Sequence, residues 1–208
     1  STLMRSSAAS DVYKRQIQFP LPSLENDERT MKERFRQEGL EGPYIAIVPG
    51  ARWDVKEWPV AYWIGLCRRL VAEGIPIVLL GSRDDMEKGN TILKGVESPL
   101  LHDFTGKTTL KELMAAISLG AVYISADTGP LHIANALKKE LIALFGPTSP
   151  DRTGPYGGAD SSYIHMILSP TAKATPEHPL VDDPDCMAQI SVDSVCNVAM
   201  TAWKKVTT

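Results

Sequence analysis

Cysteine and concentrated positive charge are both scarce in this sequence of 208 residues. The three cysteines, Cys67, Cys186 and Cys196, are odd in number and lack zinc-ligand spacing, which favours a reducing, cytoplasmic setting and structural roles. The net charge is −3, and no dense cluster of lysine and arginine appears outside Arg68–Arg69, which lie on a predicted helix surface. We therefore expect no nucleic-acid partner and no general attraction to anionic lipid.

Long hydrophobic runs are also missing, so we expect no transmembrane segment. Hydrophobic residues make up 43% of the chain and charged residues 23%, which is the balance of a globular protein. A chain of this length can bury a substantial core. The length predicts one domain of roughly 150 to 170 residues with additional terminal segments.

The N-terminal residues do not have the pattern of a folded element. Residues 1–16 lack apolar periodicity and look like translated sequencing adapter, so we interpret them as a non-native segment. A signal peptide is the alternative, but there is no continuous apolar stretch to support it. Residues 17–42 are predicted to form a linker, extended at Pro20 and Pro22, and then a polar surface helix that ends at Gly39. The domain itself is assigned to residues 43–208.

Strand-like and helix-like segments alternate through that domain. Short apolar runs predict strands, and longer segments with apolar residues every three or four positions predict helices. The predicted strands are residues 44–48, 75–80, 100–104, 122–125, 141–145 and 163–168, and the predicted helices include 60–73, 84–94 and 192–205. Such alternation predicts an α/β fold, namely a Rossmann-like, doubly wound parallel sheet.

One further helix is indicated by its starting residues. Thr109 and Glu112 have the spacing of a capping box, and the helix that follows should bury its apolar residues, which are Leu110, Leu113, Met114 and Ile117. The final helix should likewise bury Val195, Val198, Ala199 and Ala202.

The turn after the fourth predicted strand has the features of an anion site. Asp127 or Thr128 can cap the next helix, Gly129 lets a bulky group approach the backbone, and Pro130 is well suited to a first turn. His132 lies on the same turn. The free N–H groups and the helix dipole would favour a phosphate or pyrophosphate. The alternative is an ordinary capped helix.

Polar residues follow each of the first five predicted strands. The loops read PGARWDVKEWP, GSRDD, TGKT, SADTGP and FGPTSPDRTGPYG, in chain order. In a parallel sheet the carboxyl ends of the strands meet at one edge, where ligands bind. Basic, carboxylate and hydroxyl groups should therefore gather around one ligand site.

These loops also carry a family resemblance. PGARWDVKEWP, LLGSRDD, SADTGPLHIANAL with ALFGPTSPDRTGPYG, and DPDCMAQISVDSV together resemble the C-terminal half of the bacterial lipopolysaccharide heptosyltransferases, from about residue 44 to 195. That family, glycosyltransferase family 9, has GT-B architecture and transfers heptose from ADP-heptose to the lipopolysaccharide inner core. The resemblance implies that residues 43–208 are the donor-binding domain of an inverting glycosyltransferase.

The resemblance implies a role for several residues. Lys56 would meet the donor phosphates, and Asp127, Thr128, Gly129 and His132 would hold the pyrophosphate and the sugar. A lysine and a helix N-terminus can stabilise the departing diphosphate, so we expect no metal and no other cofactor besides the donor substrate. Because a carboxylate repels a phosphate, Asp127 would instead bond heptose hydroxyls or orient a neighbouring group.

Three other residues are candidates for the donor. Asp84 or Asp85 could accept hydrogen bonds from the ribose hydroxyls, and the residues do not decide between them. Arg52 is a second candidate for the phosphates. Each candidate has a plain structural alternative: a solvated loop cation for Lys56 and Arg52, a helix N-cap for Asp84 and Asp85, and a structural histidine for His132. We interpret Trp53 and Trp58 as packing residues rather than base-stacking platforms.

In the resembling family, the acceptor-binding half and the general base lie in an N-terminal domain, which we expect this chain to lack. We therefore expect this chain to be a fragment that binds the donor but does not transfer the sugar by itself. The intact enzyme would meet the lipopolysaccharide acceptor through that domain, and its peripheral association with the inner face of the inner membrane stays open. The sequence of the proline-rich stretch 169–186 does not decide which acceptor the intact enzyme uses or which heptosyltransferase subtype it is.

Two alternatives to this function remain. The chain could be a non-catalytic nucleotide-binding module, or the donor domain of another GT-B glycosyltransferase that uses a UDP- or GDP-sugar. The sequence does not determine which nucleotide base the donor carries, because purine selectivity rests on backbone contacts and on pocket shape.

Overall fold

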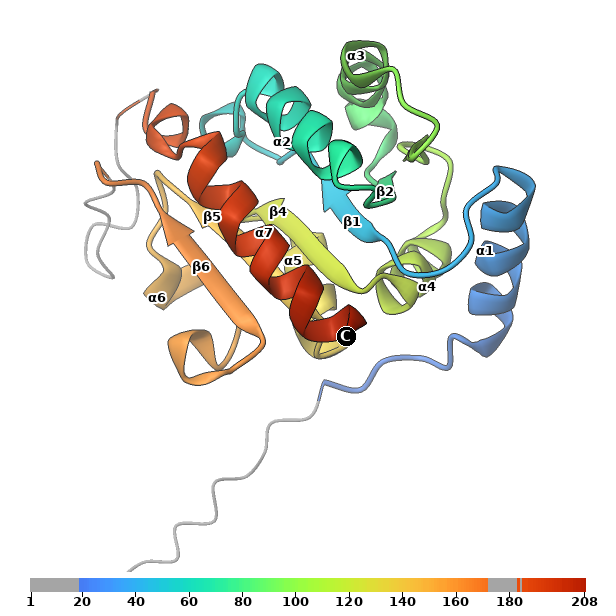
Figure 1. Cartoon of the computed structure of the whole chain (residues 1–208). Coiled ribbons are helices and arrows are strands. Elements are labelled where there is room, and N and C mark those ends of the chain that lie inside the picture. Colours follow the sequence, from blue (N-terminus) through green and yellow to red (C-terminus); the bar gives the residue numbers. More distant parts are fainter. Residues whose placement is uncertain (1–18, 172–182, 184) are drawn as a thin grey trace, which may run out of the picture.

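Six parallel strands form a single sheet in the computed structural model, which describes residues 19–171, 183 and 185–208 (Figure 1). The adapter-like segment 1–16 and most of the proline-rich stretch lie outside the described residues. Every neighbouring pair of strands is parallel. In spatial order the strands are β3 (Leu101–Asp103), β2 (Ile77–Leu79), β1 (Ile45–Val48), β4 (Val122–Ala126), β5 (Glu140–Phe145) and β6 (Ile164–Leu168). The predicted doubly wound sheet is confirmed.

Helices cover both faces of the sheet, which is why its central strands are buried along their whole length. One face carries α2 (Val60–Ala72), α3 (Met86–Val96) and α7 (Val192–Thr207), and the other carries α1 (Glu25–Gln37), α4 (Leu110–Leu119) and α5 (Gly129–Ala136). Figure 1 shows α7 in red lying along the sheet beside β4 and β5. Each face has its own hydrophobic cluster.

Helix α1 belongs to the second of these clusters. The sequence predicts a polar surface helix here, and the helix is present, but Met31 and Phe35 are buried. Its Arg34 donates to the Lys107 carbonyl at 2.8 Å and pairs with Glu112 at 3.2 Å. Two buried side chains are enough to dock a helix whose other positions are charged or polar.

The inner face of α4 agrees with the prediction at Ile117 and in part at Leu113, and it differs at Leu110 and Met114. The capping box is confirmed, since the Thr109 N–H donates to Glu112 Oε2 at 2.7 Å and Thr109 Oγ1 accepts from Glu112 N at 3.3 Å. However, Leu110 is 63% exposed, and the buried residues are Ala115, Ala116 and Ile117. The box fixes Leu110 on the first turn, where it faces the rim of a cavity instead of the core.

Helix α7 agrees with its predicted face, because Val195, Ala199 and Ala202 are buried and Val198 packs against the same cluster. Within the described ranges, no helix is both long enough and apolar enough to cross a bilayer.

The sheet topology sets the place of a ligand site. From β1 the chain winds outward through β2 to β3, and then returns to place β4 on the other side of β1. In register, Val48 of β1 lies beside Ser125 of β4. Beyond these two strand ends the winding direction reverses, and α/β sheets of this order bind ligands in the crevice at that point.

Candidate functional site

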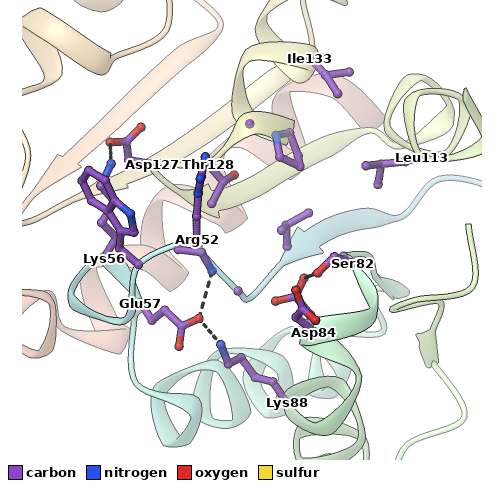
Figure 2. A pocket seen from close by; sticks show the side chains of 18 of the residues that line it. Arg52, Lys56, Glu57, Ser82, Asp84, Lys88, Leu113, Asp127, Thr128 and Ile133 are labelled. Carbon is purple, nitrogen blue, oxygen red and sulfur yellow. Dashed lines mark hydrogen bonds and ion pairs between the residues drawn. The ribbon is translucent and has the colours of Figure 1, made fainter. Parts of the chain in front are cut away.

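A cavity of about 990 Å³ opens at this point (Figure 2). Its lining comes from the loops after all of the first five strands, as predicted from their composition. Every candidate residue of the sequence analysis lies on its wall, namely Arg52, Lys56, Asp84, Asp85, Asp127, Thr128, Gly129 and His132. The cavity also falls within the range of volumes that small-molecule sites have.

The turn after β4 presents a helix N-terminus to the cavity. Thr128 is the N-cap of α5 by its extended backbone, although its side chain makes no capping hydrogen bond. A methyl group added to Gly129 would meet no heavy atom within 4 Å, so the backbone there is open to an approaching group. His132 is exposed on the first turn. Thr128, and not Asp127, is the N-cap residue of α5, which decides between the two residues predicted for that role.

Asp127 instead pairs with Lys56 from the loop after β1. Lys56 Nζ lies 2.6 Å from Asp127 Oδ2, and the two side chains are only 14% and 7% exposed. Figure 2 shows the two side chains directed toward each other. An ammonium has three N–H donors, so Lys56 retains donors for a ligand. Of the two roles predicted for Asp127, the orientation of a neighbouring group matches this geometry.

The two tryptophans of the same loop have different surroundings. Trp58 is fully buried, and its Nε1–H donates to the Ile190 carbonyl at 2.9 Å. Trp53 is 52% exposed and lines the cavity, with Lys56 Nζ 4.8 Å from its ring centre. The packing interpretation is confirmed for Trp58 and wrong for Trp53. The loop turns through a short 3₁₀ helix (Asp54–Lys56) between them, which places the rings in different environments.

The two aspartates after β2 also separate. Asp85 Oδ2 accepts from the backbone N–H of Ser82 at 2.7 Å and from its hydroxyl at 2.8 Å, so Asp85 forms a capping box. Asp84 is exposed on the cavity wall and forms no side-chain hydrogen bond with any other described residue. Asp85 is the N-cap of α3 by position, although its side chain caps no N–H of that helix and bonds Ser82 instead, and Asp84 is the carboxylate left available to a ligand.

Asp85 also lies directly against the first loop. A β-carbon built on Gly50 would be 1.6 Å from Asp85 Oδ1, which is far inside contact distance. The loop after β1 can therefore approach the loop after β2 because residue 50 has no side chain.

We expect Gly50→Ala to lower the free energy of unfolding by about 1–3 kcal/mol, since an added methyl group must displace a carboxylate held by two hydrogen bonds. Denaturant unfolding would measure this loss. The same substitution in an Asp85→Ala background should cost clearly less, because the colliding atoms are gone. Equal costs in both backgrounds would contradict the contact.

An ion pair that the sequence analysis did not identify supports the same loop. Glu57 Oε1 accepts from the Ala51 N–H at 3.1 Å and pairs with Lys88 of α3. Both side chains line the cavity, and Figure 2 shows Lys88 reaching up to Glu57. The only sequence signal was the presence of Glu57 in the KEWP motif, because its partner lies 31 positions away.

Arg52 remains a candidate cation. Its side chain is exposed, lines the cavity, and makes no hydrogen bond or ion pair with another described residue. In Figure 2 it extends from the first loop in the direction of Thr128. The geometry is compatible with either a ligand contact or a solvated cation.

One side of the cavity is apolar. It is formed by Leu110 and Leu113 of α4 and by Ile133 of α5. Polar and apolar walls together suit a ligand with a charged part and a flat, less polar part.

The described residues contain no group of three or more histidine, cysteine, aspartate or glutamate side chains arranged to hold a metal ion.

Comparison with known proteins identifies the family. Residues 2–179 match the family model of glycosyltransferase family 9 (heptosyltransferase). The chain belongs to this family. The matched range begins inside segment 1–16, whose adapter-like origin stays a prediction.

Among curated proteins, lipopolysaccharide heptosyltransferase 2 of Salmonella typhimurium is 37% identical to this chain over 119 residues, an alignment that covers 55% of this chain and 34% of that protein. The solved Escherichia coli ADP-heptose lipopolysaccharide heptosyltransferase II has a TM-score of 0.70 at 26% identity, over 90% of this chain and 54% of that enzyme.

The E. coli heptosyltransferase WaaC, solved with ADP, has a TM-score of 0.63 at 21% identity, over 77% of this chain and 44% of that chain. At that identity the likeness concerns the fold alone. The present chain thus spans about a third of the Salmonella relative and about half of the solved E. coli enzymes.

Proposed function

We propose that the cavity binds the nucleotide-sugar donor of a lipopolysaccharide heptosyltransferase, with ADP-heptose as the donor. The observation that carries this proposal is the convergence of five strand-end loops on one cavity, with a lysine and an open helix N-terminus on the same wall. The membership of family 9 supports the reaction class. The names of two solved relatives, which include ADP-heptose and ADP, support the choice of nucleotide.

The proposed chemistry follows from the charge that develops on the donor. When an acceptor hydroxyl displaces the nucleoside diphosphate with inversion at the sugar, negative charge builds up on the leaving phosphate. Lys56 and the N–H groups of α5 would stabilise this charge without a resident metal ion. Thr128, Gly129 and His132 would contact the pyrophosphate and the sugar, and Arg52 would supply a second cation to the phosphates.

The remaining parts of the donor match other walls of the cavity. We assign the ribose hydroxyls to Asp84, since the Asp85 oxygen Oδ2 is already used by the capping box. The lipopolysaccharide inner core is the proposed acceptor, and it would be reached from a cytoplasmic location. These assignments apply to the whole enzyme, of which the described domain would be the donor-binding part.

A nucleotide panel tests the proposal directly. We expect ADP to raise the melting temperature of the chain and UDP and GDP to raise it less, because a ligand at a hundred times its dissociation constant adds about 2.7 kcal/mol to stability. Scanning fluorimetry with ADP-heptose, ADP, UDP and GDP at equal concentrations gives the comparison. Equal shifts with all three diphosphates would favour a general nucleotide-binding module, and a larger shift with UDP or GDP would favour another donor sugar.

A further inference from the structure

The loop after β5 contributes two hydroxyls to the site that carry no assigned role. Thr148 Oγ1 lies 2.9 Å from Asp127 Oδ2, and Thr153 Oγ1 lies 3.0 Å from the same oxygen. Thr148 is 4% exposed, and Thr153 lines the cavity. Together with Lys56, they direct three donors at one carboxylate oxygen.

The contacts of these hydroxyls indicate that both protons go to Asp127. Thr148 Oγ1 has no other hydrogen-bond partner among the described residues. Thr153 Oγ1 also lies 3.3 Å from the Ser149 carbonyl, but its single proton can serve one acceptor only. The carboxylate contact is shorter and its acceptor is charged, so it is the stronger bond.

The arrangement makes the two oxygens of Asp127 unequal. Oδ2 accepts from Lys56, Thr148 and Thr153, whereas Oδ1 has no hydrogen bond with any described residue. Because three donors from two different loops fix Oδ2, the carboxylate cannot rotate without losing hydrogen bonds. One oxygen is thereby held by the protein, and the other makes no contact of this kind within the described chain, on a residue that lines the cavity.

The backbone of the β5 loop places Thr153 for this contact. Thr153 ends the short helix α6 (Pro150–Thr153), and the next N–H, that of Gly154, donates to the Pro150 carbonyl at 2.8 Å. A β-carbon on Gly154 would be 2.3 Å from that carbonyl oxygen. The tight closure of the turn thus depends on glycine, and it sets the direction of the adjacent Thr153.

We propose that Thr148 and Thr153 are positioning residues: they lock Asp127 through Oδ2, which holds the Lys56 ammonium at a fixed place on the cavity wall and leaves Oδ1 facing the donor. The role in donor recognition rests on the function proposed above. The locking of Lys56 does not, since it concerns contacts within the chain itself.

The test measures how accessible Lys56 is when the hydroxyls are removed. Trace acylation with acetic anhydride, mapped by mass spectrometry, gives the labelling rate of Lys56 relative to exposed Lys94 in the same molecule. In the Thr148→Val/Thr153→Val variant the carboxylate loses two of the three donors that fix its orientation, so Asp127 and the paired Lys56 can turn together toward the water in the cavity. We expect the Lys56/Lys94 ratio to rise about 3- to 10-fold, which corresponds to the loss of about one or two hydrogen bonds.

Matched variants separate hydroxyl loss from packing loss. Thr148→Ser/Thr153→Ser retains both hydroxyls and should keep the ratio of the unaltered chain. Thr91→Val removes a threonine hydroxyl that bonds within α3, to the Glu87 carbonyl, and should also leave the ratio unchanged. If the double valine variant fails to fold, Thr153→Val alone serves, because this residue is only partly buried.

A second measurement, ADP and ADP-heptose affinity by calorimetry, distinguishes failure of this inference from failure of the proposed function. We expect the valine variant to bind ADP about 3- to 10-fold more weakly. Unchanged labelling in the valine variants, or equal effects of serine and valine, would overturn the positioning role even if the chain binds ADP-heptose. A raised ratio in a chain that binds neither ligand would support the positioning role and refute the donor assignment.

Discussion

Replacing Trp58 with alanine is expected to lower the free energy of unfolding by about 3–5 kcal/mol, the usual cost of truncating a large buried aromatic side chain. Trp58 is fully buried and packs edge-to-face on Trp63, with the ring centres 4.8 Å apart, and on Tyr62 at 5.6 Å. Its indole N–H also bonds the Ile190 carbonyl, which would lose a buried donor. Denaturant or thermal unfolding measures the loss.

Replacing Trp58 should do more than leave a void in the core. Ile190 lies just before α7, so the indole joins the loop after β1 to the start of the last helix. Trp58→Phe keeps most of the ring and removes the hydrogen bond, and it should cost about 1–3 kcal/mol, the cost of leaving a buried polar group unpaired.

Trp53→Ala is the matched control for Trp58, because it removes the same side chain from the same loop. Trp53 is half exposed and contacts Lys56 mainly through its ring face, so its loss should cost at most about 1 kcal/mol. Similar losses for the two tryptophans would mean that the loop is not packed as described.

The sheet and the place of the site could be predicted from sequence because both depend on local patterns. The buried strands are short apolar runs, such as residues 141–145, and each ends at glycine, proline or a polar group. The rule that parallel strands present their carboxyl ends at one edge then brings the five loops together. No knowledge of any side-chain contact was needed for that step.

The contacts within the site could not be predicted in the same way. Lys56 and Asp127 are 71 positions apart, and their pairing depends on the rotamers that the folded loops permit. Thr148 and Thr153 belong to a loop whose hydroxyl groups were expected near the site, but their role depends on the Asp127 carboxylate that they contact. Leu110 has the apolar spacing of an inner face, and the capping box, which the sequence also predicts, does not reveal that this side chain is exposed at the cavity rim.

Glu57 illustrates a third kind of limit. It sits in a recognisable motif, but its function in the structure is to hold Lys88 and the Ala51 N–H. A motif reports that residues belong together without giving the role of each one. Side chains that support a site are therefore harder to predict than the site itself.

Lys56→Met is expected to weaken ADP binding by about 10- to 100-fold, since a hydrogen bond to a charged group contributes about 1.5–3 kcal/mol and 1.4 kcal/mol is a factor of ten. Methionine keeps most of the length of the side chain and removes its charge. Lys94→Met makes the same change on the exposed surface of α3 and should leave binding unaltered. Calorimetric titration of ADP into the three proteins gives the comparison. Equal affinities would refute the phosphate role of Lys56.

Asp127→Asn separates the charge of this side chain from its positioning role. The amide oxygen can still accept from Lys56 and from the two threonines, so the lysine should stay in place. Loss of a negative charge beside the diphosphate should then leave ADP affinity the same or increase it, because like charges repel. The preference for ADP-heptose over ADP should fall, since a carboxylate oxygen is a stronger acceptor for sugar hydroxyls than an amide. If Asp127→Asn instead weakened ADP as much as Lys56→Met, the charge of Asp127 itself would be needed to hold Lys56, and hydrogen-bond geometry alone would not suffice.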